Sequence, residues 1–258
     1  NKMVKMKNQK ICEEIRKVLS GEKEVLAIFN NGSSVVGLDT LGSDVDFVAI
    51  LKKGEDEKRV LKILRKTFRT FKNEENPEVD VEEQFDVFGR RADVTFISLK
   101  DMENKINSFY KKKENLLELQ HFIKHKIIDS VAVYDPGKFL VKWKKEIERY
   151  PKKIFDEVFN YSIKSIKENL FYWKHHQFRN EFQFCFEEWE MIEPICRAIY
   201  AKNRTLFMLP YKRLSTDLKM FKPNIEKEMY GLIKGTNTPT IIKKKIKIVE
   251  RILDKLEE

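Results

Sequence analysis

Two aspartates stand one residue apart at the start of an apolar stretch, "DVDFVAIL", at residues 44–51. On a strand, side chains two residues apart project from the same face, so Asp44 and Asp46 point the same way with Cα atoms about 6.5–7 Å apart. A carboxylate pair in apolar surroundings is costly unless something neutralises it. At that separation the pair can hold one hard divalent cation or bridge two, and Mg²⁺ prefers one or two carboxylates plus phosphate oxygens. The pair therefore predicts a metal site.

A possible phosphate-binding turn lies upstream of this pair. Gly32 and Ser33 follow an apolar run, "VLAIF" at 25–29, that has the composition of a short buried strand. Glycine permits close approach of the backbone, and exposed N–H groups together with the Ser33 hydroxyl could hold a phosphate chain. A single loop joins this turn to Asp44, so the sequence predicts that the phosphate cradle and the metal ligands lie together.

A third carboxylate is expected from a later strand. Asp93 stands in "ADVTF" with apolar neighbours that would hold it rigid, whereas Asp80 and Asp86 compete for the same role. Three acidic side chains beside a phosphate-binding turn would support a two-metal displacement at phosphorus.

The elements that must position these residues follow from periodicity. An amphipathic helix is expected over 3–20, ended by Gly21, and a second over 55–71, whose acidic start suits the helix dipole. Strands are expected at 25–29, 44–51, 79–88 and 90–98, the last two joined by a turn at Gly89. The first half is therefore predicted to be a mixed α/β unit with about four strands.

The second half has a different character. Residues 101–128 are predicted to be helical, 130–139 to hold a short strand and a Pro-Gly turn, and the chain from Pro151 onward to be helical only. Two bundle seams are expected, one over 178–199 and one near the C-terminus. Their members are Phe178, Phe182, Cys185, Trp189, Ile192, Cys196 and Ile199 in the first and Ile242, Ile246, Val249, Leu253 and Leu256 in the second.

The predicted fold class is an α+β domain over 1–145, with a small mixed sheet and flanking helices, followed by an all-α helical bundle over 146–258. Within the aromatic stretch 171–190, side chains off the seam remain available to line an acceptor cleft. Glu181 is the first choice, with Glu188 and Tyr172 beside it, because a carboxylate there could act as general base or bind a cationic acceptor. His121 and His125 have a zinc-compatible spacing but no evident third ligand, which favours ordinary histidines.

The amino-acid composition limits which binding partners are expected. The 258 residues carry 51 Lys and Arg against 41 Asp and Glu, a formal net charge of +10, which favours anionic partners such as nucleotides or RNA. The two tight lysine runs, at 111–113 and 243–245, are expected to be solvated helix faces. Three widely spaced cysteines indicate neither a disulfide framework nor a zinc site. No apolar run approaches the roughly 18–20 residues of a membrane span, so a cytoplasmic location without membrane contact is expected.

The order of these motifs resembles the nucleotidyltransferase superfamily of DNA polymerase β. An apolar strand, Gly-Ser, a loop, Asp-x-Asp in a strand and a third Asp on a later strand match within residues 25–51 and 90–98. The helical half is similar in layout to the single-chain antibiotic nucleotidyltransferases that modify aminoglycosides and lincosamides. The stretch "YAKNRTLFMLPYKRL" at 200–214 resembles their Asn-containing helix end followed by a Lys.

The resemblance implies a role for each matching residue. Gly32, Ser33 and Ser43 would bind the nucleotide, and its leaving pyrophosphate would be neutralised by metal and by a cation, first Lys212 and then Arg204 or Lys138. Asp44, Asp46 and Asp93 would be the catalytic and metal-binding carboxylates, holding two Mg²⁺ ions or Mn²⁺ in their place. Asp93 is also a candidate for drawing the proton from the acceptor hydroxyl.

The implied activity is transfer of a nucleoside monophosphate, AMP from ATP first, to a hydroxyl of a small acceptor such as an antibiotic. An RNA-directed nucleotide-adding enzyme is the second reading, favoured by the basic charge but without a concentrated basic stripe. A non-catalytic binding protein such as an antitoxin is the third, and the large helical half argues against it. Protein AMPylation stays open.

Overall fold

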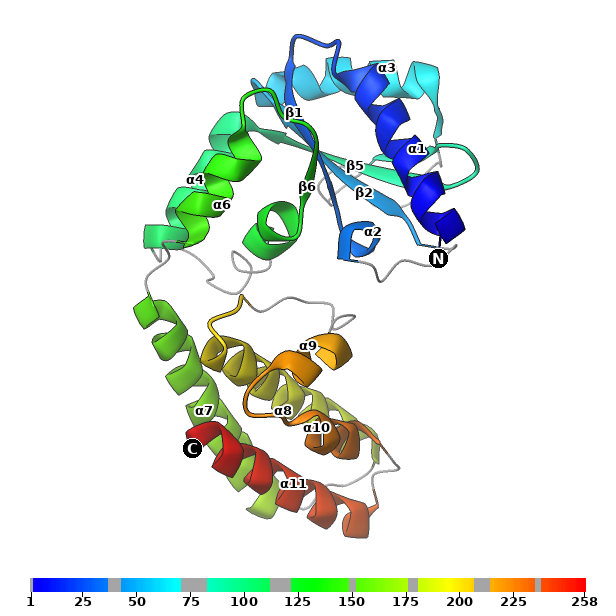
Figure 1. Ribbon diagram of the computed structural model, residues 1–258. Coiled ribbons are helices and arrows are strands. Elements are labelled where there is room, and N and C mark those ends of the chain that lie inside the picture. Colours follow the sequence, from blue (N-terminus) through cyan, green and yellow to red (C-terminus); the bar gives the residue numbers. More distant parts are fainter. Residues whose placement is uncertain are drawn as a thin grey trace. The chain divides into compact units, whose positions relative to one another are not determined.

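The computed structural model describes residues 2–36, 43–70, 83–111, 122–148, 152–175, 181–206, 214–234 and 238–258 (Figure 1). The chain divides into two compact units, Asn1–Arg149 and Tyr150–Glu258.

The first unit is built on a mixed sheet, which within the described residues has six strands in the order β3-β4-β5-β2-β1-β6 (Figure 1). The strands are β1 (Val25–Asn31), β2 (Val45–Leu51), β3 (Arg69–Thr70), β4 (Glu83–Asp86), β5 (Arg91–Ser98) and β6 (Val131–Tyr134). β2 and β5 run parallel, and the other neighbouring pairs are antiparallel. β1 and β2 are buried over nearly their whole length, which explains why they read as continuous apolar runs.

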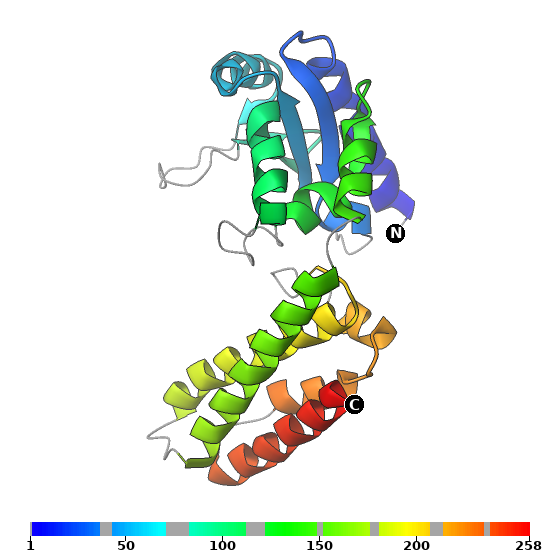
Figure 2. The same cartoon turned by 90° about the vertical axis from the view of Figure 1, so that its left-hand side faces the viewer.

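Different helices cover the two faces of the sheet. α1 (Lys2–Leu19) and α3 (Glu57–Thr67) pack on one face, where Ile15 and Leu64 join Phe47 in one apolar core. On the other face, Phe29 of β1 meets Trp143 of α6 (Phe139–Glu148) edge to face, with ring centroids 6.0 Å apart. Figure 2 shows α4 (Leu99–Lys111) and α6 in front of the strands on this second side. Even-numbered residues of β2 and odd-numbered residues of β5 face this side, because successive strand side chains alternate.

The predicted elements of the first half are confirmed where the structure describes them, with one difference at the end of the second helix. The helix expected over 55–71 begins as a 3₁₀ turn, Gly54–Asp56, and α3 ends at Thr67. Phe68 is extended, with φ −119° and ψ 149°, and its ring packs at 6.3 Å from that of Phe85 on β4. This aromatic contact draws the chain into β3, which together with β6 brings the sheet above the four strands expected.

The second unit consists of helices throughout its described residues, as expected. They are α7 (Lys152–His175), α8 (Glu181–Lys202), α9 (Leu214–Met220), α10 (Glu226–Ile233) and α11 (Pro239–Glu257). α11 starts where the Thr238 hydroxyl accepts a hydrogen bond from the Ile241 amide and Pro239 takes the first helical turn. Figures 1 and 2 both show α11 alongside α7, where Lys167 pairs with Glu257 at 2.6 Å. The predicted fold class is confirmed: a mixed sheet with flanking helices and then a helical unit.

The seam of α8 runs along a different line from the one expected. Cys185 and Trp189 are exposed, and the buried line begins instead with Phe184 and Glu188 and continues through Met191, Ile195 and Ile199. The later members Ile192, Cys196 and Ile199 are buried as expected, so the difference lies at Cys185 and Trp189. Phe178 and the Phe182 side chain lie outside the described residues. In the C-terminal seam Val249, Leu253 and Leu256 are buried as expected.

A buried ion pair explains the shift. Lys245 of α11, expected on a solvated face, is only 1% exposed, and its Nζ lies 2.5 Å from Glu188 Oε1. The ammonium also stands 5.9 Å from the centre of the Phe184 ring, a cation–π distance. Glu188 therefore faces the core of the second unit rather than an acceptor cleft, which makes that prediction wrong. A seam predicted from apolar residues alone misses a buried position that is occupied by one member of a charged pair.

Among the described residues, no helix is both long enough and apolar enough to cross a membrane.

The buried pair predicts a strong asymmetry between single and double substitution. Lys245→Met leaves the Glu188 carboxylate buried without its counter-charge and should lower the free energy of unfolding by about 3–5 kcal/mol. Lys245→Met combined with Glu188→Leu replaces the pair by apolar groups and should recover most of that loss. Lys247→Met, on the exposed face of the same helix, is the control and should change stability by less than about 0.5 kcal/mol. Urea unfolding measures all three, and equal effects of Lys245→Met and Lys247→Met would contradict the assignment.

Candidate active site

The three aspartates of the first unit lie at one end of its sheet. Asp46 on β2 and Asp93 on β5 are direct partners in the parallel register, so their side chains project side by side from the same face. Neighbouring strand positions are about 4.8 Å apart, close enough for two carboxylates to share a cation. Asp93 is 7% exposed and sits between Ala92 and Val94, both fully buried, which fixes its position. Asp44 stands two residues before Asp46, just ahead of β2.

The register separates Asp93 from its competitors. Asp86 lies on β4, which pairs with the far side of β5, and its carboxylate accepts a hydrogen bond of 2.7 Å from the Gly89 amide in the β4–β5 turn. Asp80 falls outside the described residues. Asp93 is thus the described candidate that lies directly beside Asp46.

Gly32 lies directly against the Asp46 carboxylate. Asn31, the last residue of β1, is the antiparallel partner of Asp46, and Gly32 follows it with φ +74°, in the left-handed region. A Cβ built on Gly32 would stand 1.8 Å from Asp46 Oδ2, which is impossible without movement. With the Asp46 carboxylate in this position, residue 32 must therefore lack a Cβ, and the predicted binding of phosphate by the Gly-Ser turn stays a prediction. Ser33 begins the short helix α2 (Ser33–Val36), drawn at the end of β1 in Figure 1.

Arg91 is the counter-charge of the cluster, and the sequence analysis did not identify it. Its side chain leaves β5 on the same face as Asp93, bonds the Asp44 carboxylate through Nη2, and places Nε 3.7 Å from Asp93 Oδ1. The hydrogen bond to Asp44 raises the pKa of Arg91; burial opposes that rise, and the charges of Asp44, Asp93 and Asp46 add to it. The negative charges of all three carboxylates thus act on the Arg91 guanidinium. An Arg two residues before a candidate metal ligand on a strand was the available sequence signal.

The donor set suits Mg²⁺, because it consists of hard carboxylate oxygens next to a glycine bend. As they stand, however, no three or more His, Cys, Asp or Glu side chains in the described ranges form a group that could hold a metal ion. Arg91 lies among these carboxylates, where its guanidinium pairs with Asp44 and approaches Asp93. The residues fit a divalent cation in chemistry and in strand register, provided that Arg91 releases Asp44.

Two asparagines in "FNNGS" buttress the bend. The Asn30 side chain donates to the Asp46 carbonyl oxygen at 2.9 Å and accepts a 3.2 Å hydrogen bond from Ser34 in α2. Asn31 is fully buried, and its Nδ2 lies 3.3 Å from Nε2 of His125. These contacts fasten β1, α2 and the start of β2 together. A polar pair in the last two positions of an otherwise apolar strand was the sequence signal for this support.

His125 and its neighbour come from a π-helical turn, η2 (Lys124–Ile128). Lys126 Nζ donates to the Thr95 hydroxyl at 3.1 Å, two residues beyond Asp93 on the same face of β5. The turn therefore brings a histidine and a lysine to the carboxylate-bearing face of the sheet. π-turns often occur at functional sites. His121, which has a zinc-compatible spacing from His125 but was expected to be an ordinary histidine, lies outside the described residues.

Of the remaining predicted nucleotide contacts, Ser43 serves the site through its backbone. Its carbonyl oxygen accepts a 2.9 Å hydrogen bond from Nε of the buried Arg90, which steadies the approach to Asp44. Lys212 lies outside the described residues. In the second unit, Arg204 pairs with Asp156 at 2.7 Å and donates to the Lys152 carbonyl oxygen.

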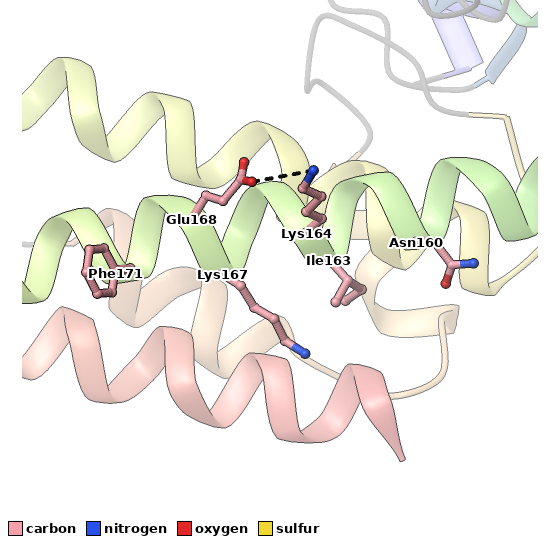
Figure 3. A pocket seen from close by; sticks show the side chains of 6 residues that line it. All are labelled: Asn160, Ile163, Lys164, Lys167, Glu168 and Phe171. Carbon is pink, nitrogen blue, oxygen red and sulfur yellow. Dashed lines mark ion pairs between the residues drawn. The ribbon is translucent and has the colours of Figure 1, made fainter.

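The predicted acceptor residues also belong to the second unit. Tyr172 is half-buried against its core, and Glu181 opens α8, with its side chain outside the description. A shallow groove in this unit follows α7 instead, lined by Asn160, Ile163, Lys164, Lys167, Glu168 and Phe171 (Figure 3). Its lysines pair with Glu168 at 3.8 Å and Glu257 at 2.6 Å, so the groove carries little net charge. Tyr172 and Glu188, the predicted acceptor residues whose side chains the structure describes, are not among the residues that line it.

Comparison with known proteins found similarity among solved structures. A family-model scan and a search of curated proteins gave no match. A nucleotidyltransferase-like protein from Exiguobacterium sibiricum 255-15 is similar with TM-score 0.44 and 9% identity, over 95% of this chain and 72% of that one. Spectinomycin adenyltransferase AAD(9) from Enterococcus faecialis, solved with ATP and spectinomycin, is similar with TM-score 0.38 and 13% identity. This similarity covers 95% of this chain and 98% of that one. The fold assignment therefore rests on the strand order and the helical unit described above.

The contact between Gly32 and Asp46 predicts a difference between two glycines with the same backbone angle. Gly32 and Gly89 both have φ +74°, but a Cβ at Gly89 meets no atom within 4 Å. Gly89→Ala should lower the free energy of unfolding by about 1–2 kcal/mol, the cost of the left-handed conformation. Gly32→Ala should cost a further 1–3 kcal/mol or so because it also overpacks against the carboxylate.

A double substitution tests the cause. Asp46→Ala removes the two nearest atoms and leaves its own Cβ at 3.2 Å, so Gly32→Ala should cost less in that background than in the wild-type chain. Urea unfolding of the four variants gives the coupling free energy. Strict additivity would show that the two residues are not in contact.

Proposed function

We propose that the chain is a Mg²⁺-dependent nucleotidyltransferase that moves AMP from ATP to a hydroxyl of a small acceptor and releases pyrophosphate. The observation that carries the proposal is the Asp46–Asp93 register on parallel strands with the Gly32 bend directly against Asp46. It combines an anionic site for a divalent cation with a glycine bend, whose backbone N–H groups can bind phosphate.

The bend and the carboxylates have separate roles in this proposal. Backbone amides at Gly32 and the Ser33 hydroxyl bind the terminal phosphates, and Asn30 and Asn31 hold the bend rigid against β2. Asp44, Asp46 and Asp93 would hold Mg²⁺, which supplies neutralisation of charge on the reacting phosphate and the departing pyrophosphate. Ser43 positions Asp44 through the hydrogen bond from Arg90.

Asp93 is the proposed acceptor of the substrate proton. It is the most buried of the three aspartates and is fixed between two buried apolar residues of β5. The acceptor oxygen forms a bond to the α-phosphorus as the bond from phosphorus to the pyrophosphate oxygen breaks, and the hydroxyl proton passes to the Asp93 carboxylate. Such a base contributes typically 10²–10⁴-fold when it is correctly placed. Tyr172 and Glu181 remain predicted acceptor contacts, and Lys212 remains a predicted phosphate contact.

Nucleotide binding is the first expected outcome. ATP with Mg²⁺ should raise the melting temperature of the wild-type chain more than ATP in EDTA, and Asp46→Asn should abolish the difference. Asp86→Asn is the matched control, because that carboxylate serves only the Gly89 turn and its amide oxygen can still accept the same hydrogen bond. Thermal shift with each nucleoside triphosphate measures this. A well-folded wild-type chain that none of them stabilises would remove the proposal.

Transfer is tested with the same variants. ATP, Mg²⁺ and a panel of aminoglycosides, lincosamides and spectinomycin should give an adenylylated product by mass spectrometry together with pyrophosphate, reduced at least about 10²-fold by Asp46→Asn. RNA oligonucleotides belong in the panel because the formal charge of +10 also suits an RNA acceptor. If the chain extends RNA, and this activity falls steeply at higher salt, then the acceptor is RNA rather than a small molecule.

A further inference from the structure

Arg91 occupies the place where the proposed function needs a cation. Its Nη2 bonds Asp44 Oδ2 and its Nε lies 3.7 Å from Asp93 Oδ1, so one guanidinium bridges the first and third carboxylates. A guanidinium on Asp44 competes with a metal ion for the electron density of that carboxylate, and the two cations repel each other. Metal binding by all three aspartates is therefore favoured when Arg91 changes its partner.

The position of Arg91 allows such an exchange. Its side chain is 44% exposed, whereas that of Asp93 is 9% exposed, so the guanidinium can rotate while the carboxylate stays fixed. Arg91 is the first residue of β5, at the end of the sheet that also carries the Gly32 bend. A guanidinium matches carboxylate and phosphate oxygens equally well through its planar fork of N–H donors.

On this basis, and resting on the proposed function, we infer that Arg91 is a positioning residue that exchanges Asp44 for a nucleotide phosphate. In the metal-free protein it neutralises the carboxylates and opposes the binding of a divalent cation alone. When a triphosphate binds at the Gly32 bend, one of its phosphates accepts hydrogen bonds from the Arg91 guanidinium in place of Asp44. The Asp44 carboxylate then becomes available to the metal. Metal and nucleotide are thereby coupled, and by linkage each favours the binding of the other.

The exchange predicts opposite shifts in two affinities. Arg91→Gln should bind Mn²⁺ alone about tenfold more tightly than the wild-type chain, because Asp44 no longer has a competing partner. The same variant should bind the complex of Mn²⁺ with α,β-methylene-ATP about tenfold more weakly, because the phosphate loses its guanidinium. Both changes fall within the typical range of coupling between sites, 5–150-fold. A merely structural role for Arg91 would weaken both.

Electron paramagnetic resonance of free Mn²⁺ and calorimetry of the Mn²⁺–analogue complex measure the two affinities without turnover. Arg69→Gln is the matched control, since Arg69 is an exposed arginine of β3 in the same sheet and its loss changes the net charge equally. Asp46→Asn combined with Arg91→Gln should cancel the gain for Mn²⁺. Arg91→Lys keeps the charge but not the planar fork, so both of its affinities should lie between those of the wild-type chain and Arg91→Gln. It replaces Arg91→Gln in the test if that variant folds poorly.

The inference is overturned if Arg91→Gln and Arg91→Lys bind Mn²⁺ alone no more tightly than the wild-type chain. It is also overturned if Arg69→Gln shows the same gain, because net charge would then be the cause. If ATP with Mg²⁺ still stabilises the wild-type chain in either case, the proposed function stands and only the role of Arg91 falls. If ATP with Mg²⁺ binds no variant, both fall.

Discussion

The arrangement of the first unit depends on the cost of placing three carboxylates at one end of a buried sheet. Each of them would be expensive in low-dielectric surroundings without a counter-charge, and together they repel one another. Arg91 meets this cost in the protein as it stands, from the same strand as Asp93. The Asn30 and Asn31 side chains and the Arg90–Ser43 hydrogen bond then hold the surrounding backbone in the position that this cluster requires.

Sequence reasoning succeeded where a residue type has a single physical justification. A glycine after a buried strand predicted a place where another group approaches the backbone closely, and a Cβ there would stand 1.8 Å from Asp46 Oδ2; phosphate as the approaching group stays a prediction. The alternation of β2 predicted that Asp44 and Asp46 share a face, and the apolar neighbours of Asp93 predicted a fixed position. The pairing of Asp93 with Asp46 could not be predicted, because strand order is set by contacts across the whole sheet. Sequence preferred Asp93 for its apolar neighbours but left Asp80 and Asp86 as competitors for that reason.

Sequence reasoning failed where charged residues occupy buried positions that are usually apolar. The expected seam of α8 passed through Cys185 and Trp189, whereas the core contains Glu188 opposite Lys245. Nothing in a single helix shows that its glutamate has a partner on another helix 57 residues away in the chain. Arg91 was missed for a related reason: its spacing two residues before Asp93 is a weak signal among 51 basic residues, and its position beside Asp44 exists only in the folded sheet.

The two ion pairs show how exposure decides what such a contact can do. Lys245 is 1% exposed and Glu188 9%, so separating them would leave two charges in the core, and the pair can only fix the relative position of α8 and α11. Arg91 is 44% exposed, and water can replace its carboxylate partner at small cost. The same chemistry is therefore permanent in the helical unit and exchangeable at the end of the sheet. An exchangeable cation is what a site needs if part of its negative charge is to be offset before its ligand arrives and phosphate is to be accepted afterwards.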